Sequence, residues 1–287
     1  MSIVLGTATQ ANLLALQNIN SELGVTQNHL ASGLAVASAT DDAVKYFQSQ
    51  QLSNRANDLS ARKSQIDQGI QSLTAATNGI SSAISILQQM EGIVNGASTQ
   101  TAAQRASAAT QFNTLGQQLS TLLGDASYQG LNLVNSTASN LTLQFSLAST
   151  STLKITGQNL LFSKLVTGGK ALGVGSKAAT TLITVKFSAV SNKISKFTVI
   201  YNALQTAVFK AQASAQTLGT NVNFLQTRMS FTQAYMTTLN QGASDLTVAD
   251  VNQESTNLVT LQTRQQLALQ SLSIATQSEQ SVLRLFH

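Results

Sequence analysis

Apolar side chains recur along this chain at the alternating three- and four-residue spacing of a helix that buries one face. The first long run occupies 52–94, where ten of the thirteen stripe positions are apolar. A second run of equal length occupies 197–239, where twelve of thirteen are apolar. Because a long helix with one apolar face needs a partner, the two runs predict helices that pack against each other as a rod.

Between these runs the pattern changes. A shorter helical stripe covers 105–122. At 141–147 apolar residues then recur at every second position, which predicts a strand. Residues 152–156 are its expected partner across a tight turn. Residues 157–180 are rich in Gly, Ser, Thr and Lys, which is typical of a loop, and 182–187 forms a further short strand candidate.

Both ends of the chain carry a helical stripe but few charges. Residues 1–40 hold one acidic residue, Glu22, and 255–287 hold three charged residues. Helices of soluble coiled coils normally carry charges beside the apolar seam. We therefore expect these ends to be stable only when buried against other copies of the chain. The stripe residues predicted to drive polymerisation are Leu13, Leu16, Ile19, Leu23, Leu30, Leu258, Leu261, Leu272, Val282, Leu285 and Phe286.

Composition removes most functions that depend on reactive side chains. The 287 residues include no Cys, no Pro and no Trp, and His occurs only at 29 and 287. We therefore expect no disulfide, no metal site and no cofactor, and we expect that the protein is not an enzyme. The absence of Pro leaves the chain free to build long uninterrupted helices.

Two further patterns concern membranes. No stretch reaches the about 18 consecutive apolar residues of a membrane span, so no membrane insertion is expected. The N-terminal residues lack the positively charged region of a secretory signal, so a general secretory route is not indicated, and a protein that is secreted without a cleaved signal peptide stays open.

The net charge of +5 is unevenly distributed. Between Asp125 and Asp245 the chain has nine basic residues and no acidic one. The lysines are scattered and no aromatic residues alternate with them, so the stacking and bidentate chemistry of base recognition is missing and no nucleic acid partner is expected. A solvated, lysine-bearing surface is the simpler interpretation, and contact with an anionic polysaccharide stays open.

Short motifs near both ends resemble those of bacterial flagellins. The segment LASGLAVASATDDA at 30–43 resembles the family's LSSGLRINSAKDDA motif. The segment YQGLNL at 128–133 is similar to the aromatic-x-Gly segment that leads into a hairpin in that family. Three segments resemble the family's C-terminal helix and its terminal NVLSLL: STNLVTLQ at 255–262, QQLALQ at 265–270 and SVLRLF at 281–286.

The resemblance implies a mainly α fold: a long antiparallel helical coiled-coil rod, a small β-hairpin region, and terminal helices paired in a filament core. It covers about 1–135 and 195–286, so no large outer domain is expected. It assigns the connector to Gly33, which would give the bend, and to Asp41 and Asp42, which suit a helix N-terminus. The expected parts are 1–40 (N-terminal core helix and connector), 41–135 (rod helices), 136–190 (β-hairpin and variable surface segment), 191–244 (C-terminal rod helix) and 245–287 (C-terminal core helix).

The resemblance also implies a function. Flagellins are exported unfolded through the flagellar type III channel, polymerise beneath a cap and build the helical filament that is turned as a propeller for motility. The expected partners are therefore the chain itself, in a helical homopolymer, the flagellar cap, hook-junction proteins and an export chaperone, and the expected location is the extracellular flagellum. Polymerisation of this kind uses head-to-tail contacts that generate a helix.

Two alternatives stay open from the sequence. Hook–filament junction proteins share similar terminal helices. A filament with an added adhesin role towards anionic polysaccharide would account for the basic middle of the chain.

Overall fold

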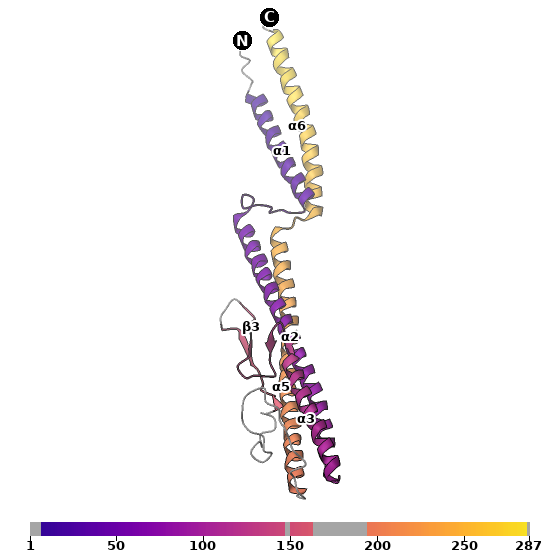
Figure 1. The fold of residues 1–287 in the computed structure, drawn as a ribbon. Helices are drawn as coiled ribbons and strands as arrows, with labels where there is room; N and C mark the ends of the chain where they lie inside the picture. Colours follow the sequence, from indigo (N-terminus) through magenta and orange to yellow (C-terminus); the bar gives the residue numbers. More distant parts are fainter. Residues whose placement is uncertain (1–6, 147–149, 163–193, 286–287) are drawn as a thin grey trace. The chain divides into compact units, whose positions relative to one another are not determined.

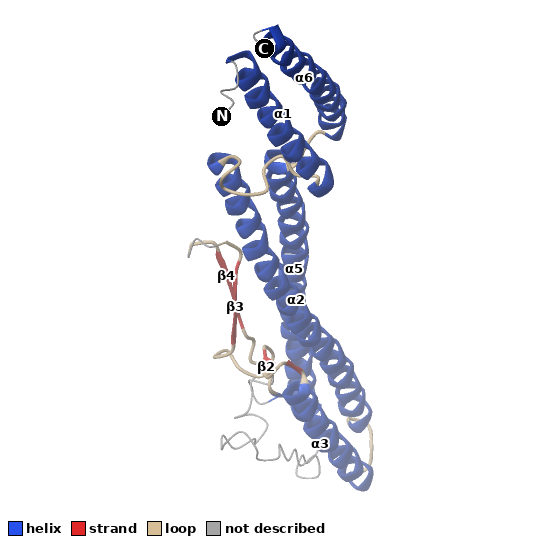
Figure 2. Cartoon of the chain, turned by 90° about the horizontal axis from the view of Figure 1, so that it is seen from above, coloured by secondary structure: helices blue, strands red, loops and turns tan. Residues whose placement is uncertain are grey.

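The computed structural model describes residues 7–146, 150–162 and 194–285. The chain divides into a terminal unit, made of 1–57 and 236–287, and a central unit, made of 58–235. The described residues form five helices and two small antiparallel sheets (Figures 1 and 2). The main hydrophobic core lies in the central unit.

The central unit is built on two long helices, α2 (Ala43–Ala97) and α5 (Ile194–Thr247), whose ends extend into the terminal unit. Each is about 80 Å long. They run antiparallel, and Lys63 Nζ donates a hydrogen bond to Gln233 Oε1 at 2.7 Å. No position of either predicted stripe is exposed, so the expectation of paired rod helices is confirmed.

Helix α3 (Ala102–Asp125) packs beside α2 and α5 as the third member of this core (Figures 1 and 2). It begins after Thr101, whose N–H donates to Gln104 Oε1 at 3.0 Å in a capping box. The positions of its stripe are buried or half-buried, and the Phe112 and Phe162 rings meet edge to face with their centroids 6.1 Å apart. The apolar residues predicted from the helical spacing therefore form the core between the three helices.

Two hairpins follow α3. Strands β1 (Ser127–Tyr128) and β2 (Leu131–Asn132) are joined by Gln129 and Gly130, whose φ angles of 48° and 80° are typical of a type I′ turn. Strands β3 (Asn140–Gln144) and β4 (Thr152–Thr156) pair as the sequence predicts, with Leu143 opposite Leu153. The expected strand at 182–187 and most of the expected loop at 157–180 lie outside the described residues.

The terminal unit contains helices α1 (Thr7–Ser32) and α6 (Val251–Leu285) and the adjoining ends of α2 and α5. Neither α1 nor α6 belongs to the hydrophobic core of the central unit. Their apolar side chains are therefore buried by each other or are left exposed.

Candidate functional site

The helices α1 and α6 lie side by side and antiparallel (Figures 1 and 2). Three polar side-chain pairs, spaced along both helices, link them, and residue numbers rise in α1 as they fall in α6. The pairs are Asn12 Nδ2 donating to Ser271 Oγ at 3.3 Å, Gln265 Nε2 donating to Asn20 Oδ1 at 2.7 Å, and His29 Nδ1 at 3.0 Å from Glu254 Oε1. These pairs hold the two helices in one register over most of the length of α1.

The predicted polymerisation residues lie mostly on the faces where α1 and α6 meet. Leu261 is buried at 7% exposure, and Leu13 is 40% exposed. The half-buried members of the set are Leu16, Ile19, Leu23, Leu30, Leu258 and Leu272. The side chains of Val282, Leu285 and Phe286 lie outside the described part. Within a single chain, the described stripe of α1 therefore packs against the described stripe of α6.

A second set of apolar side chains on the same helices is exposed. Leu14 and Val25 of α1 are 60% and 50% exposed, and Val259, Leu267 and Ile274 of α6 are 62%, 60% and 62% exposed. At 3.6 residues per turn these positions fall on the sides of α1 and α6 that are turned away from the stripe between them. We call these five residues the outer faces of the terminal helix pair.

Sequence reasoning missed the outer faces because it followed one heptad frame along each helix. The signal that could have found them is the set of apolar residues outside that frame. A helix that is apolar on two opposite sides and nearly without charge is typical of a helix buried on all sides. The terminal helix pair therefore exposes apolar surface that the rest of the chain does not cover.

The connector between α1 and α2 is tied to the connector between α5 and α6. Gly33 ends α1 with a positive φ of 71°, and its N–H donates to His29 O at 2.8 Å, which is the usual glycine cap of a helix C-terminus. Ala35 N donates to Thr247 O at 2.8 Å, and Ala249 N donates to Gly33 O at 3.0 Å. The chain therefore bends at Gly33, and the two connectors form one hydrogen-bonded crossing.

The two connector aspartates have different roles. Asp42 caps α2, because its Oδ1 accepts the N–H of Lys45 at 3.0 Å. Asp41 was expected beside it at the helix end, but its Oδ2 accepts hydrogen bonds from Ser38 N at 2.8 Å, Ser38 Oγ at 3.0 Å and Ala37 N at 3.0 Å. These bonds, the backbone N–H of Ser38 first, hold the pKa of the Asp41 carboxyl below its usual value. Asp41 therefore stabilises the turn of the connector, and it does not cap α2 as Asp42 does.

Other kinds of site have little support in the described ranges. There, no group of three or more His, Cys, Asp or Glu side chains is close enough to hold a metal ion. No helix among the described residues is long and apolar enough to cross a bilayer. Five of the nine basic residues between Asp125 and Asp245 fall in 163–193, outside the described residues.

Two family models match the chain. The model of the bacterial flagellin N-terminal helical region matches residues 5–139, and the model of the bacterial flagellin C-terminal helical region matches residues 201–286. Together these matches include α1, α2, α3 and almost all of α5 and α6.

Curated relatives match along nearly the whole length. Flagellin FljO of Caulobacter vibrioides is 29% identical over 280 residues, which are 96% of this chain and 95% of that one. A flagellin of Brucella melitensis biotype 1 is 26% identical over 290 residues, which are 99% of each chain. Among solved structures, a putative flagellar hook-associated protein from Vibrio parahaemolyticus shares the fold, with a TM-score of 0.59, 13% identity, and coverage of 72% of this chain and 100% of that chain.

Proposed function

The chain belongs to the bacterial flagellin family and is a structural subunit of the extracellular flagellar filament, and we propose that it polymerises through the outer faces of its paired terminal helices. The observation that carries this proposal is the exposure of Leu14, Val25, Val259, Leu267 and Ile274 by half or more of their surface. The stripe between α1 and α6 pairs the helices first, and the outer faces then bury against neighbouring copies.

The energetics favour this division of roles. Complete burial of one aliphatic side chain contributes about 1.5–3 kcal/mol, and side chains that are already half covered contribute roughly half of that. Five such residues therefore supply several kcal/mol for each subunit added to a filament. The rest of the two helices is rich in uncharged Gln, Asn, Ser and Thr, which can hydrogen-bond between copies without leaving an unpaired buried charge.

The parts of the chain take their roles in the filament from this contact. We assign 1–40 and 245–287 to the filament core, 41–135 and 191–244 to the helical rod outside it, and 136–190 to a hairpin and a variable surface segment. The polymerisation residues of the stripe, including Val282, Leu285 and Phe286, belong to the same core. Export through the flagellar type III channel, growth beneath a cap, a chaperone and contact with hook-junction proteins complete this proposal.

A junction role is less well supported than a filament role. The hook-associated neighbour is 13% identical, so its likeness concerns the fold alone. The relatives matched over 95% or more of their own length at 26–29% identity are flagellins.

Seeded growth tests the proposal. Purified monomer with both Leu267→Asp and Ile274→Asp is added to sheared filaments of the unaltered protein, and filament length is measured by negative-stain microscopy. We expect growth to stop, because two carboxylates would be buried without partners. Ser81→Asp is the control, since Ser81 is an exposed polar residue of α2 in the central unit, outside the terminal helix pair, and it should still extend the seeds. Normal growth of the double variant would contradict the proposal.

A further inference from the structure

An unusual row of aromatic residues lies on the outward side of α5 in the central unit. Phe224 and Phe231 are 49% and 55% exposed, and both fall on the side of the helix opposite its buried stripe. Arg228 lies between them, with its guanidinium carbon 5.0 Å from the centroid of the Phe145 ring and 5.2 Å from that of Phe231. Tyr235 stacks on Phe231 at 6.0 Å. We call these five residues the aromatic ladder.

The members of the ladder hold one another in place. Phe145 follows β3, is 6% exposed, and meets Phe224 edge to face at 6.0 Å. An arginine between two rings is fixed by cation–π contacts on both sides, which leaves the edge of its guanidinium free for an anionic partner. The Nε–H of Arg228 is buried and donates no hydrogen bond to any of the described residues. The ladder is therefore a rigid aromatic surface with one central positive charge.

A surface of this kind on an extracellular protein calls for a covering partner, because contiguous exposed apolar patches mark interaction sites. In a filament each subunit is surrounded by copies of itself. The partner surface is therefore expected on another face of the same chain, and it should carry a negative charge opposite to that of Arg228.

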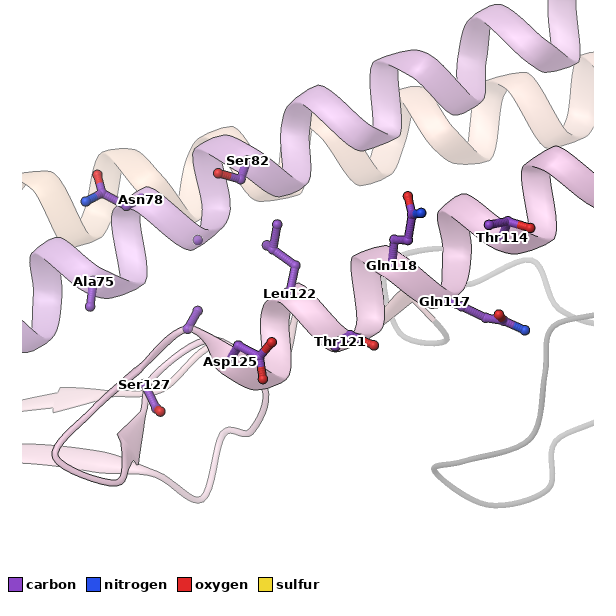
Figure 3. A pocket seen from close by; sticks show the side chains of 12 residues that line it. Ala75, Asn78, Ser82, Thr114, Gln117, Gln118, Thr121, Leu122, Asp125 and Ser127 are labelled. Atoms are coloured by element: carbon purple, nitrogen blue, oxygen red, sulfur yellow. The ribbon is translucent and has the colours of Figure 1, made fainter.

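The central unit has such a face in the groove between α2 and α3, of about 830 Å³ (Figure 3). Small residues of α2, including Ala75, Gly79 and Ser82, line one wall, and Leu122 projects from α3 towards them. The lining contains one carboxylate, Asp125, and no basic residue. Thr121 of α3 also lines the groove.

We propose that the aromatic ladder of one subunit docks into the α2–α3 groove of a neighbouring subunit in the filament. An incoming ring contacts Leu122 in the groove, and Arg228 pairs with Asp125 of the neighbour. The proposal rests on the proposed function, because it requires a polymer. It concerns the central unit, whereas the outer faces belong to the terminal unit.

The two surfaces differ, so the contact is head-to-tail, which generates a helical polymer where successive contacts do not close into a ring. They also lie at different levels of the central unit. Because Lys63 pairs with Gln233, the ladder lies at the level of α2 residues near 67, whereas the groove centres near residue 79. Docking therefore shifts neighbouring subunits by roughly 18 Å along the helix direction.

Cross-linking between two variants tests this contact directly, since the chain has no cysteine of its own. Phe231→Cys and Thr121→Cys monomers are mixed with unaltered monomer, grown from seeds, and treated with a short bismaleimide. Both positions are exposed in the subunit. We expect covalent dimers in the mixed filaments and none above background in filaments that contain either variant alone. Ser81→Cys replaces Thr121→Cys in the control, because Ser81 is exposed on α2 and does not line the groove.

The outcomes separate this inference from the proposed function. Equal dimer yields with Thr121→Cys and Ser81→Cys, or dimers from Phe231→Cys alone, would overturn the ladder contact while filaments still grow. Loss of filament growth in the variants of the outer faces concerns only the proposed function.

A charge exchange gives a second measurement that does not need the cross-link. Arg228→Asp and Asp125→Arg should each raise the critical concentration for polymerisation about tenfold, and the double variant should recover most of that loss. If Arg228→Asp leaves polymerisation unchanged but abolishes retention of the monomer on an anionic polysaccharide column, the ladder binds polysaccharide and the proposal is overturned.

Discussion

His29 Nδ1 lies 3.0 Å from Glu254 Oε1, and this contact joins the last turn of α1 to the first turn of α6. The two side chains are 22% and 17% exposed. A carboxylate in the first turn of a helix is also favoured by the helix dipole. The pair therefore fixes the terminal helix pair at the end where both helices meet the connectors.

Breaking this contact should loosen the terminal helices without disturbing the central unit. We expect His29→Ala and Glu254→Ala each to cost about 1 kcal/mol, and the double variant to cost less than the sum of the two. The measurement is amide hydrogen exchange in α1 and α6 of the monomer, with the amides of α3 as the internal control. Strictly additive effects would show that the two side chains do not interact.

A larger residue in place of Gly33 should destabilise the bend of the connector. With φ at 71°, an alanine there would adopt a left-handed conformation, so Gly33→Ala should destabilise the connector by about 1 kcal/mol. Gly24→Ala is the matched control, because Gly24 lies inside α1 with open space around it and should stabilise the helix by about as much. Hydrogen exchange of the connector amides measures both, and equal effects of the two changes would argue against the strained bend.

The core of the central unit should depend on Phe112. This ring is 1% exposed and contacts Phe162, so Phe112→Ala should lower the free energy of unfolding by about 3–5 kcal/mol. Phe209→Ala, at a position that is 65% exposed on α5, should change it by less than about 0.5 kcal/mol. Circular dichroism melts of the two monomers make the comparison, and similar melting temperatures would contradict the packing described for α3.

Glu91 should destabilise the central unit at neutral pH. Desolvation raises the pKa of this carboxyl above its ordinary value of 4.5, so the folded state resists ionisation there more than the unfolded state does. Glu91→Gln should therefore raise the melting temperature at pH 7, and the gain should disappear below about pH 4, where both states are protonated. A gain that persists at low pH would assign the effect to packing instead of charge.

The sequence predicted the parts of the fold that depend on periodicity. The stripes through Ile66, Leu73, Leu204 and Leu218 are buried, and the pairing of β3 with β4 follows the alternation of Leu141 and Leu143. These elements could be predicted because burial on one face leaves a regular spacing.

The candidate site was less accessible to sequence reasoning. The stripe through Leu16 and Leu261 was predicted to drive polymerisation, in terminal helices that pair with each other, and in the single chain its described members are mostly buried or half-buried. Whether Val259 or Leu261 faces the partner helix depends on the register of α1 against α6, and polar pairs such as Asn20 with Gln265 set that register. This pair joins residues that are 245 positions apart, and the spacing of apolar residues carries no information about contacts at that separation.

A reconstruction of the assembled filament by electron cryomicroscopy, with side chains resolved, tests the central claim most directly. We expect five side chains that are half or more exposed in the single chain to be buried against neighbouring copies in the filament core: Leu14, Val25, Val259, Leu267 and Ile274. A filament in which these five side chains stay exposed to solvent, while the subunits are joined elsewhere, would contradict it.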